Sequence, residues 1–232
     1  MAEMLFSLPT APVVAVKGEA KAYPVGRIFG VGRNYADHAA EMGVEADRES
    51  PAYFTKSPGA ACESGRTVAY PPGTKDFHYE MELVVALGAP VFRATAAEAE
   101  AAIFAYGCGL DMTRRDLQQA AFARRRPSDL GKDVEDSAVF APLTRAAEFG
   151  AVGSQRIHLA VNGDVKQDAR LSDMIHDVVG IIVDLSGFYH LRPGDLIMTG
   201  TPAGVRPVMP GDVITGGIDG LDPVNLTVGA AE

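Results

Sequence analysis

Two glutamates that open an apolar run constrain the fold more than any other feature of the sequence. Glu80 and Glu82 lie next to residues 83–87, which are apolar and partly β-branched, so this stretch predicts a buried strand. Side chains alternate along a strand, and the two carboxylates therefore project from the same face. Because two bare carboxylates buried so close together repel each other, we expect something cationic between them.

A third carboxylate follows a second apolar run. Asp111 ends the stretch of residues 103–110. Three carboxylates carried on strand ends would form a hard, oxygen-rich site suited to Mg²⁺, Mn²⁺ or Ca²⁺. The alternative from spacing alone is a pair of solvated strand glutamates, because no cluster of Cys or His fixes a metal site.

Length and composition limit the classes of protein that need be considered. The 232 residues suit one large domain with a short extension, and we predict an N-terminal segment over residues 1–26 and a main domain over residues 27–232. A net charge of −9 argues against a nucleic-acid partner. No apolar run reaches the roughly 18 residues of a membrane helix. Two cysteines indicate no disulfide framework, which favours the reducing cytoplasm.

Residues 27–43 predict a short strand, a glycine turn and a helix that ends at Gly43. The Gly-x-Gly of this turn lacks the third glycine and the long βαβ unit of a dinucleotide site, so we reject that interpretation. His38 and Glu41 are three residues apart and share one helical face. A histidine held by a carboxylate is a candidate general base. The alternative is a surface pair worth a few tenths of a kcal/mol.

Two further stretches in the first half of the chain carry structural predictions. Residues 51–56 read as a short strand ending in Lys56, which either faces a substrate carboxylate or is an ordinary surface lysine. Turn signals over residues 57–72 predict a hairpin. A helix is expected after Asp111, and Lys132 follows it in a polar loop.

The C-terminal third is rich in strand signals. Asn162-Gly163 predicts a hairpin turn, and residues 174–191 have helical spacing. Residues 193–205 predict a turn, a buried strand and a glycine-rich loop. The backbone N–H groups and threonine hydroxyls of that loop suit a carboxylate ligand, and a plain tight turn is the alternative.

Several motifs occur in a fixed order along the chain: GVGRNYADHAAEM, FTK, HYEMEL, GLDMTRRDLQ, Lys132, VNGDVKQ and PGDLIMTGTPAGV. Together they closely resemble the fumarylacetoacetate hydrolase family over residues 27 to about 220. Within the family, the wording around VGRNYADHAAEMG, PPGTKDFHYEMELVVALG and DMTRRDLQ is most similar to bacterial members that hydrolyse fumarylpyruvate in gentisate catabolism.

The resemblance implies an α+β fold, a mixed β-sandwich roll with short flanking helices, and a homodimer. It implies a divalent cation, Mg²⁺ or Mn²⁺, held by three carboxylates: Glu80, Glu82 and Asp111. It implies a catalytic group in which two residues activate water and a lysine steadies developing negative charge: His38, Glu41 and Lys132. It implies three side chains that line the substrate pocket: Arg33, Gln118 and Thr201.

The implied reaction is hydrolysis of the C–C bond of an acylpyruvate, a small keto acid, with fumarylpyruvate giving fumarate and pyruvate. Two alternatives remain within the family, decarboxylation of oxaloacetate or a related keto acid and isomerisation. A third, from another class, is a non-catalytic binding protein on the same fold. Two residues depart from the common pattern, Arg206 in place of a glycine and Val134 in place of an aromatic, and we expect them to alter the pocket mouth.

Overall fold

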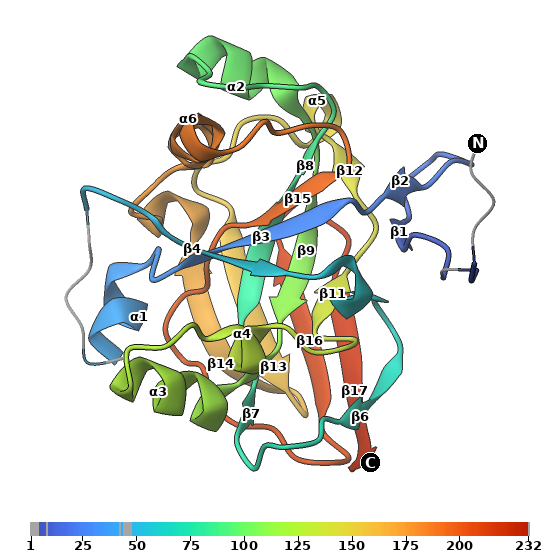
Figure 1. Ribbon diagram of the computed structural model, residues 1–232, viewed down its shortest axis with the longest axis vertical. Helices are drawn as coiled ribbons and strands as arrows, with labels where there is room; N and C mark the ends of the chain where they lie inside the picture. Colours follow the sequence, from blue (N-terminus) through green and yellow to red (C-terminus); the bar gives the residue numbers. More distant parts are fainter. Residues whose placement is uncertain (1–4, 8, 42, 44–47, 232) are drawn as a thin grey trace.

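Strands are the most extensive regular elements of the described chain, and most of them pair into two mixed sheets (Figure 1). The computed structural model describes residues 5–7, 9–41, 43 and 48–231. Within this part of the chain, the larger sheet has eight strands: β3 (Arg27–Gly32), β4 (Ala52–Lys56), β5 (Ala61–Glu63), β8 (Met81–Leu87), β9 (Ile103–Asp111), β11 (Ala138–Phe140), β12 (Thr144–Arg145) and β15 (Asp195–Met198). The smaller has five: β6 (Thr67–Tyr70), β13 (Arg156–Val161), β14 (Asp164–Arg170), β16 (Val213–Ile218) and β17 (Val224–Ala231).

Two short two-stranded ribbons and a set of short helices complete the described chain. The ribbons pair β1 (Val13–Val14) with β2 (Tyr23–Pro24), and β7 (Phe77–His78) with β10 (Thr113–Arg114). The α-helices are α1 (Ala36–Glu41), α2 (Ala96–Ala102), α3 (Arg115–Ala123), α4 (Asp129–Lys132), α5 (Ala146–Phe149) and α6 (Val178–Phe188). Two 3-10 turns are η1 (Pro58–Ala60) and η2 (Leu171–Asp173). None of the helices in the described chain has the length and apolarity needed to cross a membrane.

The larger sheet runs in the order β4-β3-β15-β8-β9-β11-β5, with β12 also paired to β9. Neighbours are antiparallel except for β15 with β3 and β11 with β5, and β17 with β6 is parallel in the smaller sheet. Both sheets are therefore mixed. With the short helices, this arrangement confirms the predicted α+β class.

Strand β8 lies at the centre of the larger sheet, and all of its residues are buried. Leu83 and Val85 join the main core, which also contains Ile157 and Ile214 of the smaller sheet. Val84 alternates with them and joins a second cluster on the opposite face, together with residues of the N-terminal segment. Because both faces of β8 are covered, its sequence reads as a continuous apolar run.

This alternation decides where the carboxylates point. Glu80 and Glu82 fall on the same face as Val84, away from the main core. Glu82 lies opposite Gly109 of β9, and the N–H of Asp111 donates to the carbonyl oxygen of Glu80 at 2.9 Å. The pairing of β8 with β9 therefore brings all three carboxylates to one end of the central strands.

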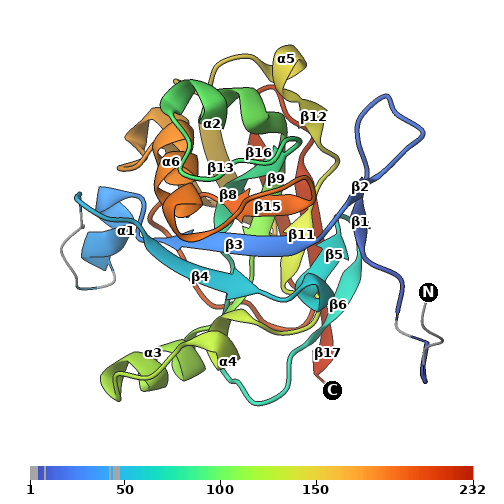
Figure 2. The same cartoon turned by 45° about the horizontal axis from the view of Figure 1, so that its top comes forward.

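Most of the helices gather at the two ends of the larger sheet (Figure 2). In both views α2, α5 and α6 lie at one end and α3 and α4 at the other, while α1 lies at the side of the molecule. Helices α3 and α4 contact each other, and α4 also packs against β4. The second group borders the end of the sheet that carries the carboxylates.

Three local predictions need correction. Residues 57–72 do not form a hairpin, because β5 pairs with β11 in the larger sheet and β6 pairs with β17 in the smaller one. Turn signals predict where the chain changes direction, but they do not predict which strand pairs with the one that follows the turn. The helix predicted over residues 174–191 is confined to α6, where the side chain of Asp177 accepts from the N–H of Gly180 at 2.7 Å and so begins the helix. Lys132 ends helix α4 rather than lying in a loop.

The turn at Asn162-Gly163 is confirmed, since both residues have positive φ, 53° and 86°, and they join β13 to β14. The N-terminal segment packs on the larger sheet through buried side chains, among them Val14 and Tyr23. The division at residue 26 stays a prediction.

Candidate active site

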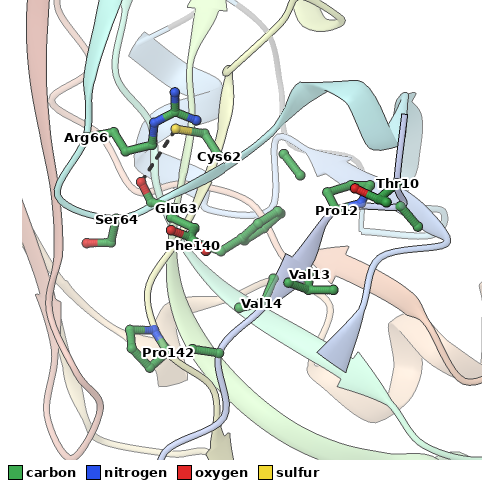
Figure 3. A pocket seen from close by; sticks show the side chains of 13 residues that line it. Thr10, Pro12, Val13, Val14, Cys62, Glu63, Ser64, Arg66, Phe140 and Pro142 are labelled. Atoms are coloured by element: carbon green, nitrogen blue, oxygen red, sulfur yellow. Dashed lines mark hydrogen bonds between the residues drawn. The ribbon is translucent and has the colours of Figure 1, made fainter. Parts of the chain in front are cut away.

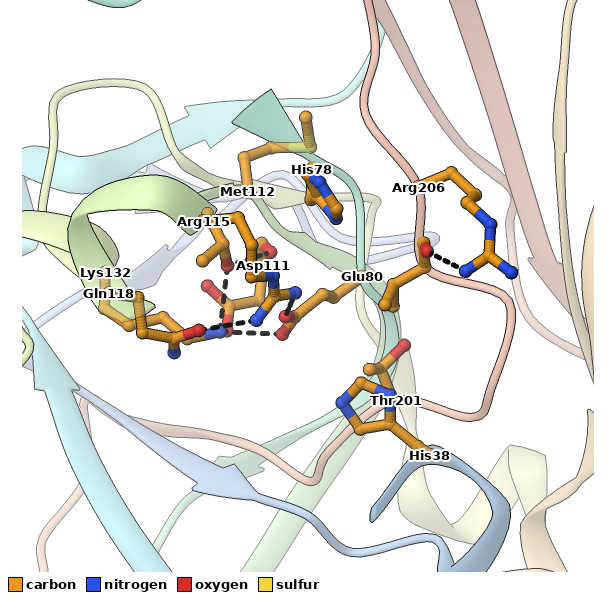
Figure 4. Close-up of polar contacts among 12 residues, drawn as sticks. His38, His78, Glu80, Asp111, Met112, Arg115, Gln118, Lys132, Thr201 and Arg206 are labelled. Carbon is orange, nitrogen blue, oxygen red and sulfur yellow. Dashed lines mark hydrogen bonds and ion pairs between the residues drawn. The ribbon is translucent and has the colours of Figure 1, made fainter. Parts of the chain in front are cut away.

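Three carboxylates converge at the end of the larger sheet where β8 begins and β9 ends. Figure 4 labels two of them, Glu80 and Asp111. Glu80, Glu82 and Asp111 each offer an oxygen, and these oxygens lie within 4.8 Å of one another. The residues are 4%, 1% and 0% exposed. Such a set of hard oxygen donors suits Mg²⁺ or Mn²⁺.

Three buried cationic side chains surround this cluster. Arg115 forms an ion pair with Glu80. Lys132 Nζ lies 2.7 Å from Glu80 Oε2 and also pairs with Asp111. Lys56 Nζ lies 2.9 Å from Asp111 Oδ1. The protein itself therefore provides cations beside the carboxylates, as the sequence predicted. Three cationic side chains accompany the three carboxyl groups.

Glu82 is the exception within the cluster. Its Oε2 accepts from the N–H of Gly200 at 2.8 Å, and among the described residues no cationic side chain forms an ion pair with it. Burial, together with the charges of Asp111 and Glu80, raises the pKa of Glu82 well above its usual value. Burial acts in the same direction on Glu80, but its cationic neighbours outweigh it and lower that pKa. Glu82 is thus the carboxylate that a bound divalent cation would relieve most, so the donor set fits such an ion.

Helix α1 brings a histidine to the same site. His38 is 5% exposed, and its Nδ1 lies 3.5 Å from Glu41 Oε2, at the limit of a hydrogen bond. The two residues share one face of the helix, as their spacing predicts. Burial lowers the pKa of His38, so the imidazole is neutral near neutral pH and able to accept a proton.

The glycine-rich loop after β15 binds two of the protein's own carboxylates. The N–H of Gly200 donates to Glu82, and the N–H of Gly204 donates to Glu41 Oε2 at 3.0 Å. Arg206 adds an ion pair to Glu41. The sequence predicted a loop suited to a carboxylate ligand, and its backbone donors are here occupied by side chains from β8 and α1.

Asn34 anchors this loop. Its Nδ2 donates to the carbonyl oxygens of Thr199 at 2.8 Å and His176 at 2.9 Å. Gly200 has a φ of 97°, and a Cβ there would lie 2.7 Å from the Cβ of Asn34 and 3.0 Å from the carbonyl oxygen of Val31. A glycine is therefore needed both for the backbone conformation and for the close approach.

One pocket of about 500 Å³ collects most of the predicted site residues. Its lining includes Arg33, His38, Glu80, Glu82, Gln118, Lys132 and Thr201, together with Arg115, Phe54 and Phe122. Asp111 and Glu41 stand behind this lining, each in contact with a residue that forms it. Neither Val134 nor Arg206 is among the residues that line the pocket, and Arg206 forms an ion pair with Glu41.

A second cavity, of about 530 Å³, lies between the N-terminal segment and β5 (Figure 3). Its charged lining residues are Glu63 and Arg66. The group of potential metal ligands found in the described chain lies elsewhere. The chemistry is therefore concentrated in the pocket beside α1.

Comparison with known proteins identifies the fold and the site together. The family model described as fumarylacetoacetate (FAA) hydrolase C-terminal matches residues 27–229. The chain belongs to the fumarylacetoacetate hydrolase family. The family prediction is confirmed, and with it the family's mixed α+β fold of a curled sheet with short helices.

Three members of the family illustrate the similarity. A fumarylpyruvate hydrolase from Ralstonia sp is 50% identical over 194 residues, which are 82% of this chain and 100% of that protein. An oxaloacetate tautomerase from Escherichia coli is 38% identical over 199 residues, 85% of this chain and 90% of its own. The crystal structure of fumarylpyruvate hydrolase from Pseudomonas aeruginosa in complex with Mn²⁺ and pyruvate is 39% identical, with a TM-score of 0.95 over 98% of this chain and 100% of that one.

Sequence reasoning missed two residues of this family site. Arg115 is 3% exposed, and besides its ion pair to Glu80 it donates to Gln118 Oε1 at 2.5 Å. The spacing of DMTRRDLQ, which puts an arginine three residues before Gln118, carries that signal. For Lys56 the surface alternative was wrong, because the residue is 2% exposed. Its Nζ lies 2.9 Å from Asp111 Oδ1 and donates to Ser137 Oγ at 2.8 Å, and it is not among the residues that line the pocket.

Proposed function

We propose that this protein is a metal-dependent hydrolase that cleaves the C–C bond of fumarylpyruvate to give fumarate and pyruvate. The reaction class is supported by one observation above all, a pocket in which a carboxylate cluster faces a buried histidine. The substrate is supported by the 50% identity to the Ralstonia enzyme over its whole length.

We propose that Glu80, Glu82 and Asp111 hold Mg²⁺ or Mn²⁺. When bound, the ion supplies Lewis acidity, which stabilises the negative charge carried by the departing pyruvate enolate and contributes several kcal/mol. Before an ion binds, the ion pairs with Arg115, Lys132 and Lys56 offset the cost of burying these carboxylates. Lys132, whose pKa is raised because Asp111 and Glu80 outweigh burial, remains a cation and offsets charge as it develops in the pocket.

His38 acts as the general base. It takes a proton from water, and the water oxygen attacks the carbonyl carbon next to the fumaryl arm. The bond from that carbon to the methylene carbon breaks with its electron pair left on the pyruvate fragment, and the water oxygen remains in the new carboxyl group of fumarate. The proton held by His38 passes to the methylene carbon and gives pyruvate. Glu41 Oε2 lies 3.5 Å from Nδ1, on one side of the ring, which leaves the other ring nitrogen to face the water. A positioned general base is worth about 10² to 10⁴ in rate.

We propose that Arg33 binds the carboxylate at the far end of the fumaryl arm. Arg115 and Lys132 also line the pocket, but both are already paired with carboxylates. Among the described residues no carboxylate pairs with Arg33, whose guanidinium lies 5.7 Å from the centre of the Phe122 ring. Its φ of 60° is unusual for a residue with a side chain, and such strain is often found at binding sites. Gln118 and Thr201 line the pocket and would contact the keto-acid end.

A turnover panel tests the function. The substrates are fumarylpyruvate, acetylpyruvate and oxaloacetate, each with Mg²⁺ and with Mn²⁺, and protein treated with chelator is the control. We expect the highest kcat/KM with fumarylpyruvate and no turnover without metal. A second candidate, oxaloacetate tautomerisation, is favoured by the 38% identity to the Escherichia coli enzyme, and a higher kcat/KM for that isomerisation would replace the first.

We propose further that the protein is a cytoplasmic homodimer with residues 27–232 as the catalytic domain. The dimer rests on the family resemblance and the compartment on the two buried free cysteines, Cys62 and Cys108. Light scattering at working concentration tests the dimer, and a monomer mass would contradict it.

A further inference from the structure

Glu41 is held more closely by the loop after β15 than by the histidine beside it. Its Oε1 accepts from Arg206 Nη1, and its Oε2 accepts from the N–H of Gly204 at 3.0 Å. His38 Nδ1 lies farther away, 3.5 Å from Oε2. Both carboxylate oxygens are engaged, and the loop provides the two shorter contacts.

The backbone from which the Arg206 side chain extends toward Glu41 is anchored in the protein, and Figure 4 labels Arg206. Its Nη1 also donates to the carbonyl oxygen of Val205 at 2.6 Å, and Val205 itself is 3% exposed. Burial favours the neutral form of Glu41, but Arg206 and Gly204 outweigh it and lower its pKa, so the carboxylate stays charged. A charged group at the last residue of α1 is thus tied to a part of the loop that is fixed in the core.

We propose that Arg206 is a positioning residue for the His38–Glu41 pair. By holding the Glu41 carboxylate, it keeps the short helix α1 against the loop and the imidazole of His38 at the pocket. The inference rests on the proposed function, in which His38 is the base.

The first test needs no turnover. Amide hydrogen exchange of the peptide that contains α1 is measured on the Mn²⁺-loaded protein. Arg206→Ala is expected to speed exchange about fivefold, the scale of a partly exposed ion pair. Arg206→Lys should stay near the wild-type rate, because one ammonium group can replace the single Nη1 contact. The matched control is Arg156→Ala, which removes an exposed arginine of β13 that is paired with Asp168 of β14, away from α1. Unchanged exchange in Arg206→Ala, or an equal change in the control, overturns the proposal.

The second test is a kinetic cycle with Glu41→Gln. We expect Arg206→Ala to lower kcat for fumarylpyruvate about fivefold with little change in KM, again on the scale of a partly exposed ion pair. Mn²⁺ affinity, measured by calorimetry, should be unchanged. Because Arg206 acts through the Glu41 carboxylate, the same substitution in the Glu41→Gln background should cost less than about twofold.

An equal loss of kcat in both backgrounds, or no loss in either, overturns the positioning role. Wild-type protein that does not turn over fumarylpyruvate would refute the proposed function, and the exchange data would still decide whether Arg206 holds α1 in place.

Discussion

The carboxylate cluster and the His38–Glu41 pair face the same pocket but are built in different ways. Glu80, Glu82 and Asp111 are held by the central strands, and their cationic neighbours are all at least 95% buried. His38 and Glu41 lie on α1, a helix of six residues. The side chain of Glu41 is 20% exposed, and that of its partner Arg206 is 62% exposed.

The difference teaches which part of the site is coupled to folding. The cluster is paired and buried, so a change there alters stability as well as chemistry. The histidine pair depends on a few contacts between a short helix and a loop, so a change there should alter turnover with little effect on the free energy of unfolding. Short, partly exposed elements of this kind often provide the movable part of an active site.

The largest effect is expected at the cluster. Glu82→Gln keeps an acceptor for the N–H of Gly200 but loses the charge that a divalent cation needs. We expect kcat/KM to fall by about 10³ or more, because the ion contributes several kcal/mol and each ~1.4 kcal/mol is tenfold. Kinetics measure kcat/KM, and calorimetric Mn²⁺ titration measures the affinity for the ion. Full activity in this variant, or in chelator-treated wild type, would remove the metal assignment.

A smaller loss is expected for the base. His38→Ala should lower acylpyruvate hydrolysis by about 10² or more, the usual scale for a lost general base. Any oxaloacetate decarboxylation should fall much less, since that reaction needs no activated water, and Glu41→Gln should act in the same way but more mildly. The measurement is kcat for both substrates on the same preparations with saturating metal. Equal losses in the two reactions would show that His38 serves binding or folding.

At the outer end of the pocket the effect should depend on the substrate. Arg33→Met is expected to raise KM for fumarylpyruvate about tenfold, because a charge-assisted hydrogen bond contributes roughly 1.5–3 kcal/mol. Acetylpyruvate has no distal carboxylate and provides the matched control, with KM expected to change less than about twofold. If the KM values of both substrates rise by the same factor, Arg33 does not bind the distal carboxylate of fumarylpyruvate.

The smallest effect separates stability from activity. In metal-free protein the pKa of folded Glu82 is raised, so its contribution to stability is present at low pH and is lost as pH rises through that raised pKa. Glu82→Gln lacks this loss. The melting temperature of metal-free wild type should therefore fall below that of the variant as pH increases, with about 2–4 °C corresponding to about 1 kcal/mol in a protein of this size. If the melting temperatures of the two proteins change in parallel with pH, the pKa of Glu82 is not raised in the metal-free protein.

Local patterns predicted several of the elements and the shared face of two carboxylates, whereas the rest of the candidate site came from the resemblance to the family. The apolar run of residues 83–87 indicated the strand that became β8, and the turn residues Asn162-Gly163 indicated the hairpin of β13 and β14. The alternation of side chains placed Glu80 and Glu82 on one face. These features depend on neighbours a few residues apart, which a sequence displays directly.

Only the tertiary structure decided which distant residues meet. Lys56 lies beneath Asp111, and Arg206 holds Glu41 across 165 positions of the chain. The same holds for residues 57–72, whose two strands joined different sheets. The sequence determined the local elements, the family motifs and the carboxylates, because each is encoded within a short window. Ion pairs and strand partners depend on how whole sheets pack, and no local periodicity records that arrangement.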